Sequence, residues 1–208
     1  MCPVKNTIDI MKIIIVGGTG TIGKKVAGAF EKDYNVIKAG SKTGDVHLDI
    51  ISPESIEQFY KEVGPFDALI SATGEGHFGS LGNMTDKDFR IGINSKLMGQ
   101  INLVLIGQHF INPKGSFTLT SGILSEDPVV AGANLSAVNG AINSFVRAAA
   151  IELNNGVRIN AISPGVVEDS PSFFPYFPGH IPVPMPKVVN GYVKSVLGAL
   201  TGQIITIF

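Results

Sequence analysis

Residues 12–23 read KIIIVGGTGTIG. The run Lys12–Val16 is almost entirely β-branched, which is typical of a buried strand. Glycines then recur at positions 17, 18, 20 and 23, and residues 21–32 follow a helical period. A strand that enters a helix through such a turn lets the backbone approach a pyrophosphate closely at the helix N-terminus. We therefore expect a dinucleotide-binding turn; the alternative is a turn in which the glycines are only structural.

Composition limits the remaining possibilities. The chain has 208 residues, of which 44% are hydrophobic and 16% charged, and this predicts one domain with a large core. The net charge is −1 and the longest basic run is Lys24-Lys25, which argues against a nucleic-acid partner. Four scattered histidines and the single Cys2 predict neither a metal site nor an internal disulfide.

The chain shows no targeting or membrane signal. Its first ten residues have neither an apolar signal core nor an Arg-rich amphipathic pattern, so we expect residues 1–10 to be a disordered arm and the protein to be cytoplasmic. Residues 128–146 lack charge but contain several Asn and Ser side chains, which are costly in lipid. A buried amphipathic helix is therefore expected there, and no membrane partner.

Strand and helix patterns alternate along the rest of the chain. This order predicts an α/β fold: a Rossmann-type doubly wound parallel sheet of about seven strands, forming a single domain over 11–208. Ligands of such sheets bind outside the carboxyl ends of the strands. Strands are expected over 12–16, 35–39, 45–48, 66–71, 116–119, 157–162 and 203–207, and helices over 21–32, 53–63, 85–110, 133–153 and 186–200.

One segment has a biased composition. Residues 171–186 read PSFFPYFPGHIPVPMP, with six prolines and four aromatic side chains. A rigid surface excursion is one interpretation. A lid at 170–186 over an apolar substrate is the other, and the position of the segment just after the carboxyl end of a strand favours it.

Seven landmarks follow one another along the chain from about residue 11 to residue 208. They are the glycine turn at 17–23, Asp49-Ile50, Ser71-Ala72-Thr73-Gly74, Asn94, Ser121, Asn160 with Pro164-Gly165, and Thr201-Gly202-Gln203. In this order they resemble the short-chain dehydrogenase/reductase family. The resemblance implies a Rossmann domain that binds a nicotinamide dinucleotide, acts on a small molecule, and commonly forms dimers through its two long helices.

The end of the second expected strand indicates which cofactor is bound. An NAD enzyme needs a carboxylate there for the ribose 2′-hydroxyl, whereas this chain carries Ser41 and Lys42. This favours NADP(H) over NAD(H), unless Lys42 is only a solvated loop lysine. The residues expected to bind the cofactor are Gly17, Thr19, Gly20, Thr21, Ile22, Gly23, Ser41, Lys42, Asp49, Ile50, Ala72, Thr73, Gly74, Pro164, Gly165 and Val166.

The catalytic set departs from the family. Members resembling this chain carry a Tyr about thirteen residues after the serine, which transfers the proton, and a Lys four residues later, which lowers the pKa of that Tyr. Counted from Ser121, those positions hold Asn134 and Val138. An amide donates hydrogen bonds but is no general acid near neutral pH. The catalytic candidates implied are Ser121, Asn94 and Asn134.

The identity of the proton donor stays open at this stage. His77 follows the strand expected over 66–71, where it either transfers a proton or only contacts cofactor or loop backbone. Tyr176 of the expected lid and a water molecule are the other candidates. Two functions follow: an NADP(H)-dependent oxidoreductase acting on a small, apolar carbonyl or alcohol, or a dinucleotide-binding sensor or partner protein that has lost catalysis.

Assembly is predicted from the two long helices. The helices over 85–110 and 133–153 carry more apolar side chains than one sheet face needs, which predicts a homodimer or homotetramer. The side chains concerned are Leu97, Ile101, Leu105, Leu135, Ile142 and Phe145.

Overall fold

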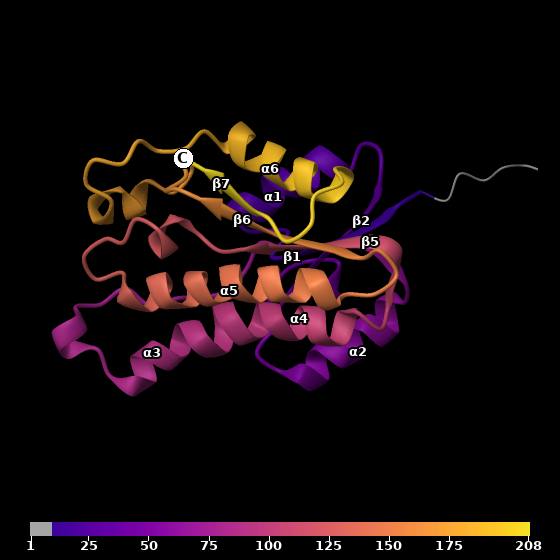
Figure 1. The fold of residues 1–208 in the computed structure, drawn as a ribbon, viewed down its shortest axis with the longest axis horizontal. Coiled ribbons are helices and arrows are strands. Elements are labelled where there is room, and N and C mark those ends of the chain that lie inside the picture. Colours follow the sequence, from indigo (N-terminus) through magenta and orange to yellow (C-terminus); the bar gives the residue numbers. More distant parts are fainter. Residues whose placement is uncertain (1–9) are drawn as a thin grey trace, which may run out of the picture.

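The computed structural model describes residues 10–208 and shows a seven-stranded sheet between two helical layers (Figure 1). Every strand pairing is parallel and the order is β3-β2-β1-β4-β5-β6-β7, which confirms the predicted doubly wound fold. The strands are β1 Lys12–Val16, β2 Asn35–Gly40, β3 Val46–His47, β4 Phe66–Ser71, β5 Ile111–Thr120, β6 Arg158–Pro164 and β7 Ile204–Ile207. The arm predicted over 1–10 lies outside the described residues, apart from Ile10.

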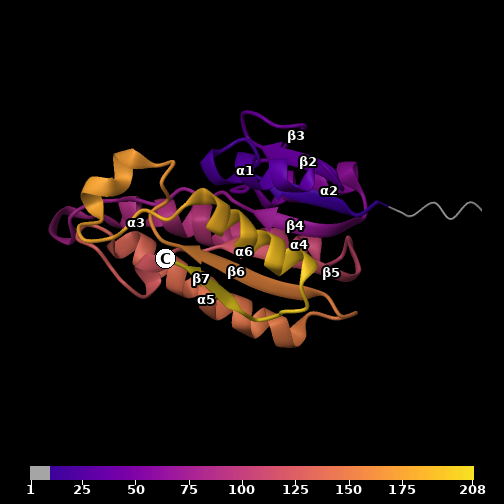
Figure 2. The ribbon, with the colours of Figure 1, turned by 90° about the horizontal axis from the view of Figure 1, so that it is seen from above.

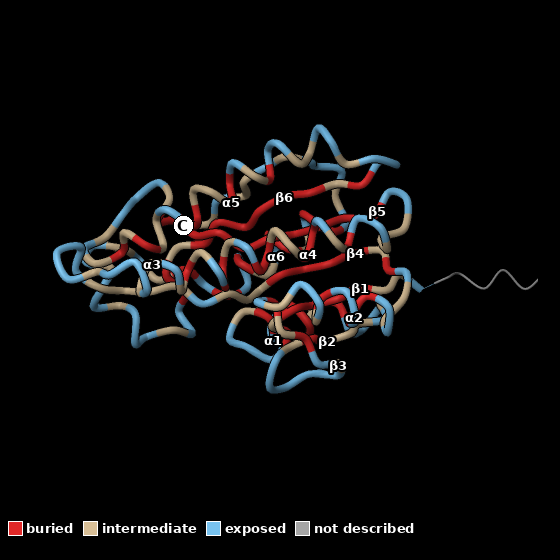
Figure 3. Tube along the Cα trace, turned by 90° about the horizontal axis from the view of Figure 1, so that it is seen from below, coloured by how far each residue is buried: buried red, intermediate tan, exposed pale blue. Residues whose placement is uncertain are grey.

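Two hydrophobic clusters hold the layers together. Alternate residues of β1 face opposite sides, so Ile13 and Ile15 join one cluster while Ile14 and Val16 join the other. α1 and α6 cover the first face, and α2, α4 and α5 cover the second, as Figure 2 shows from above. The helices are α1 Thr21–Phe30, α2 Pro53–Val63, α3 Asp86–Gly92, α4 Gln100–Gly107, α5 Ala133–Glu152 and α6 Met185–Leu197. Burial follows the strands, and the outer faces of the helices and the loops are exposed (Figure 3).

The strand order places the site. β1 lies between β2 and β4, so the chain reverses its direction of travel across the sheet at this point. Loops that leave β1 and β4 there open a crevice at the carboxyl ends of the strands. Two hydrogen bonds align these loops: Gly17 N donates to Ala39 O (2.8 Å) and Ala72 N donates to Val16 O (2.9 Å).

The helix expected over 85–110 is more complex than its sequence pattern indicates. It begins with a capping box at Thr85, since the Thr85 hydroxyl accepts from Asp88 N while the Asp88 carboxylate accepts from Thr85 N. Between α3 and α4, residues Ile93–Gly99 form a π-helical stretch, which rotates the following side chains relative to a regular helix. Such stretches often mark functional sites.

No helix within residues 10–208 combines the length and apolar character needed to cross a membrane. The uncharged stretch 128–146 instead forms the loop before α5 and most of α5 itself, where Asn134, Asn139 and Asn143 are buried against the protein.

Candidate functional site

The glycine turn after β1 forms a close-packed cradle. Gly17 has a φ of +77°, and a Cβ at this position would lie 2.6 Å from Ala72 O. A Cβ at Gly23 would collide with Gly17 O, so α1 begins directly against the turn. The N-cap of α1 is Gly20, which supplies no side-chain cap, and the first N–H groups of the helix are left for an anion. Thr19, nearby, shares a hydrogen bond of 2.7 Å with the Thr43 hydroxyl.

A cavity of about 490 Å³ lies beside this cradle, at the carboxyl ends of β1 and β2. It is mostly polar, and Lys42 at its edge is exposed and makes no ion pair within residues 10–208. The Asp49 carboxylate is partly occupied, because its Oδ1 accepts from Ile51 N at 2.9 Å. Six predicted cofactor residues line the cavity: Ser41, Lys42, Asp49, Ile50, Thr73 and Gly74.

A second cavity, of about 210 Å³, contains Ser121, and we call it the Ser121 cavity. Ser121 is 4% exposed, and its hydroxyl makes only a long bond of 3.4 Å to Ile162 O, so it remains free to bind a ligand. The polar side chains that line it are Lys96, Thr120, Ser121, Asn139 and Ser170. Its apolar wall includes the predicted cofactor residues Ile22, Pro164, Gly165 and Val166.

Aromatic side chains close one side of this cavity. Phe173 and Phe177, from the segment predicted as a lid, line it together with Phe78 from the loop after β4. The Phe78 ring packs against Phe173 at 5.9 Å and against Tyr176 at 4.9 Å between centroids. Tyr176 itself is 45% exposed and does not line the Ser121 cavity, so the structure does not bring this predicted proton donor to the serine.

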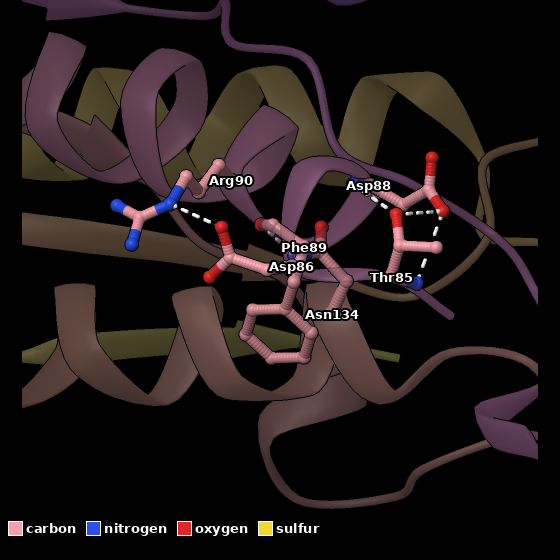
Figure 4. A network of polar contacts seen from close by, with 6 residues as sticks. All are labelled: Thr85, Asp86, Asp88, Phe89, Arg90 and Asn134. Carbon is pink, nitrogen blue, oxygen red and sulfur yellow. Dashed lines mark hydrogen bonds and ion pairs between the residues drawn. The ribbon is translucent and has the colours of Figure 1, made fainter.

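Asn134, a predicted catalytic residue, does not line the Ser121 cavity and instead makes two hydrogen bonds to the backbone. Its Nδ2 donates to Phe89 O at 2.6 Å, and its Oδ1 accepts from His77 N at 3.0 Å. Figure 4 shows its position beside α3. The side chain is fully buried, and both ends of the amide are occupied. The bond to His77 N fixes the backbone of that loop, and the His77 side chain does not line the Ser121 cavity.

The residues of α5 that do line the Ser121 cavity are Leu135 and Asn139. They follow Asn134 and Val138 by one position, and one residue turns a helix by about 100°, onto another face. Asn134, thirteen residues after the serine, therefore lies on a helix face that does not line the Ser121 cavity. Leu135 and Asn139 are also four residues apart, and both line this cavity.

Asn94 is also displaced from Ser121. It is exposed and lines a third cavity, together with Asp86 and Arg90. The next two residues in the π-helical stretch, Ser95 and Lys96, are buried. Lys96 is thus the side chain that this stretch presents to the Ser121 cavity, and the sequence analysis missed it. One signal was available: Lys96 is the only Asp, Glu, Lys or Arg between Arg90 and Lys114.

Two further polar groups near the Ser121 cavity are the Tyr192 phenol and the Asn139 amide. Tyr192 shares a hydrogen bond of 2.7 Å with the Thr120 hydroxyl, and burial raises the pKa of its phenol, which keeps it protonated. The Asn139 side chain is 3% exposed and its Oδ1 has no hydrogen-bond partner. An orphaned acceptor in a cavity wall is expected to meet a donor on a ligand, such as a ribose hydroxyl.

These features fit a dinucleotide. The turn at Gly17 and Gly23 has room for backbone contact with phosphates. The cavity of about 490 Å³, which we call the larger cavity, joins the turn after β4 to the end of β2. Ser95 lines the larger cavity and Lys96 the Ser121 cavity, so adjacent residues connect the two. Within the part of the chain that the structure describes, no cluster of three His, Cys, Asp or Glu side chains is placed to hold a metal.

Comparison with known proteins points in the same direction. A family model described as enoyl-(acyl carrier protein) reductase matches residues 22–173. A short-chain dehydrogenase/reductase of Stachybotrys chlorohalonatus, ATR9, is 29% identical in an alignment of 189 positions that covers 76% of this chain and 74% of that protein.

Solved structures agree over almost the whole chain. The protein lin1944 from Listeria innocua is 47% identical and superposes with a TM-score of 0.94, covering 95% of this chain and 100% of that one. A small-chain dehydrogenase solved in complex with NADPH is 27% identical, with a TM-score of 0.86 and coverage of 95% and 96%.

Proposed function

Because the chain belongs to the short-chain dehydrogenase/reductase family of oxidoreductases, we propose that it uses NADP(H) to interconvert a small, apolar carbonyl compound and its alcohol. The observation that carries the proposal is the pairing of a dinucleotide-shaped crevice with a small, apolar cavity that contains a free serine hydroxyl.

The cofactor preference is argued from the end of β2. Ser41 and Lys42 supply a hydroxyl and a cation beside the larger cavity, where a 2′-phosphate would be bound. Gly40, which ends β2, carries no acid that would repel that phosphate. The relative solved with NADPH supports this choice.

The roles of the chain's own residues follow from their positions. A bound nicotinamide would supply or accept the hydride. The Gly17 turn and the N-terminus of α1 would hold the pyrophosphate, and Asn139 Oδ1 would accept from a ribose hydroxyl. Ser121 donates a hydrogen bond to the substrate oxygen, and Phe173 and Phe177 exclude water from the reacting centre.

A second candidate function rests on one specific observation. Leu135 and Asn139 replace the Tyr and Lys expected of the family, and a protein without acid catalysis would bind the dinucleotide and act as a sensor or partner. We rank it second because the free serine hydroxyl and the aromatic wall enclose a cavity beside the cofactor crevice, and dinucleotide binding alone does not require such a cavity.

The test separates binding from catalysis. NADPH and NADH affinities are measured by fluorescence titration, and NADPH consumption is then followed with a panel of aldehydes and ketones. Ser121→Ala is the matched variant, because it removes one hydroxyl and should leave cofactor affinity unchanged. The reductase proposal expects turnover that Ser121→Ala lowers; NADPH binding without turnover of any carbonyl favours the sensor.

A further inference from the structure

Lys96 is the one ionisable side chain among those that line the Ser121 cavity. It lies in the π-helical stretch before α4 and is 9% exposed. Its stem packs against the turn after β4, since a Cβ at Gly74 would lie 2.7 Å from Lys96 Cα and 3.0 Å from its Cβ. Within residues 10–208 its ammonium forms no ion pair and no hydrogen bond.

A lysine this deeply buried is costly, and within residues 10–208 its ammonium makes no contact that offsets the cost. Burial lowers the pKa of the Lys96 ammonium to about 8, with no contribution from a neighbouring charge. At pH 7 the group is therefore mainly protonated, yet gives up its proton far more readily than an ordinary lysine. Donors with a pKa close to the working pH are the most effective general acids.

We propose that Lys96 is the proton donor of this site and replaces the missing tyrosine of the family. The inference rests on the proposed reductase function and names the group that completes it. A reduced nicotinamide would supply the hydride to the carbonyl carbon of the substrate, and the carbonyl oxygen would then gain negative charge. The Lys96 ammonium would donate one proton to that oxygen to give the alcohol, and the neutral amine would take up a proton from solvent.

The surroundings of Lys96 leave no competing acid. The cavity wall comes from α1, the loop after β4, β5, α5, the loop after β6 and the aromatic segment, and Lys96 is its only titratable member. The nearby Glu75 lies on the larger cavity with Ser95, and Arg90 lies on the third cavity with Asn94. Ser121 and Asn139 supply hydrogen bonds but no proton at neutral pH.

The first measurement reads the ammonium directly and needs no turnover. The protein is labelled with ¹³C at the lysine ε-carbon, and Lys96→Met identifies the Lys96 signal in a pH titration. The expected result is a pKa near 8, against the ordinary lysine value of 10.5. A Lys96 signal that titrates near 10.5 overturns the proposal.

The second measurement compares three variants across pH. Wild-type kcat/KM should fall as the pH rises through about 8, because the donor must be protonated. Lys96→Met, which keeps the length of the stem, should lose roughly 10²–10⁴-fold in kcat/KM and lose this pH limb. Lys96→Arg keeps the charge but its guanidinium holds its proton, so the limb should also disappear. Lys32→Met, at an exposed lysine after α1, is the control.

The outcomes distinguish the two proposals. Folding is checked by thermal melting and NADPH affinity by fluorescence titration, and both should be unchanged in Lys96→Met. If Lys96→Met keeps wild-type turnover, Lys96 is not the proton donor, and the reductase proposal is unaffected. If Lys96→Met loses only NADPH binding, Lys96 is a cofactor ligand and not the proton donor, and the reductase proposal is again unaffected. A wild type that binds NADPH but reduces no carbonyl overturns the reductase, and the donor with it.

Discussion

Leu135 and Asn139, four residues apart on α5, both line the cavity that contains Ser121. The pair occupies one face of the helix, whereas Asn134, on the neighbouring face, is bonded to Phe89 O and His77 N. Neither Leu135 nor Asn139 is a general acid, so we assign proton transfer to Lys96, in the π-helical stretch that packs against α5.

Restoring the family's pair at the correct positions should rescue a donor-less enzyme. In the Lys96→Met background, Leu135→Tyr with Asn139→Lys places a phenol beside Ser121 and a cation one turn away that lowers the phenol pKa. We expect the pair to recover up to about 10²-fold in kcat/KM over Lys96→Met, and more than the product of the single changes. Steady-state NADPH oxidation measures it; no gain in a folded, NADPH-binding variant would contradict the assigned positions.

The matched control moves the same two substitutions back by one residue. Asn134→Tyr with Val138→Lys changes two fully packed side chains, which are 0% and 1% exposed. It breaks both bonds of Asn134 and buries a lysine without a partner, so we expect a lower midpoint of unfolding and no gain in turnover. An active and stable control would show that the helix faces are wrongly assigned.

Cofactor preference should depend on Lys42. Lys42→Glu replaces a cation beside the larger cavity with an anion, so NADPH affinity should fall roughly tenfold or more while NADH affinity changes little. Fluorescence titration with both cofactors checks this. Lys32→Glu, the same charge change at the other end of the sheet, should leave both affinities unchanged. Equal losses for NADPH and NADH would place Lys42 away from the 2′-phosphate.

Asn134 should matter for stability. Asn134→Ala removes the side-chain partner of two part-buried backbone groups, Phe89 O and His77 N, and we expect a loss of about 1–3 kcal/mol in the free energy of unfolding. Asn94→Ala, at an exposed position, should change neither stability nor carbonyl reduction. Urea denaturation of both variants decides it, and a larger effect at Asn94 would contradict the structure.

Assembly through α4 and α5 remains a prediction, but the apolar side chains available for it differ from those expected from the sequence. Ile142 is fully buried in the core and Leu135 lines the Ser121 cavity, so neither is available for a partner. The exposed apolar side chains on these helices and the preceding π-helical stretch are Met98 (38%), Leu105 (47%) and Ile151 (87%). Leu105→Glu should shift a homodimer to monomers in sedimentation, whereas Leu81→Glu, at an exposed leucine elsewhere, should not. A monomeric wild type would contradict the prediction.

The sequence predicts the fold well because its signals are local. The side chains of residues 13–16 are buried on both faces of the sheet. Successive residues join opposite hydrophobic clusters, as strand geometry requires. The Thr85 cap and the Pro53 start of α2 are read directly from residue types. The π-helical stretch has no such signature, and its neighbour α5 lies beyond β5 in the chain, so no short window of sequence contains their contact.

The site is predicted less completely, for a geometric reason. The glycine turn and the loops after β2 and β4 are fixed to strand ends, so their residues meet in space as expected. It is harder to predict which helical side chains face the site. On α5, an error of one residue in the spacing exchanges Asn134 for Leu135. In the π-helical stretch, the wider turn leaves Asn94 exposed and Lys96 buried. Lys96 becomes a candidate only when its burial is known.

Carbonyl reduction is measured by incubating the purified protein with NADPH and a panel of apolar aldehydes and ketones, while NADPH oxidation and alcohol formation are followed together. We expect that at least one carbonyl yields its alcohol in amounts equal to the NADPH consumed, and that Ser121→Ala and Lys96→Met both slow this turnover without weakening NADPH binding. Tight NADPH binding with no alcohol formed from any carbonyl would contradict it.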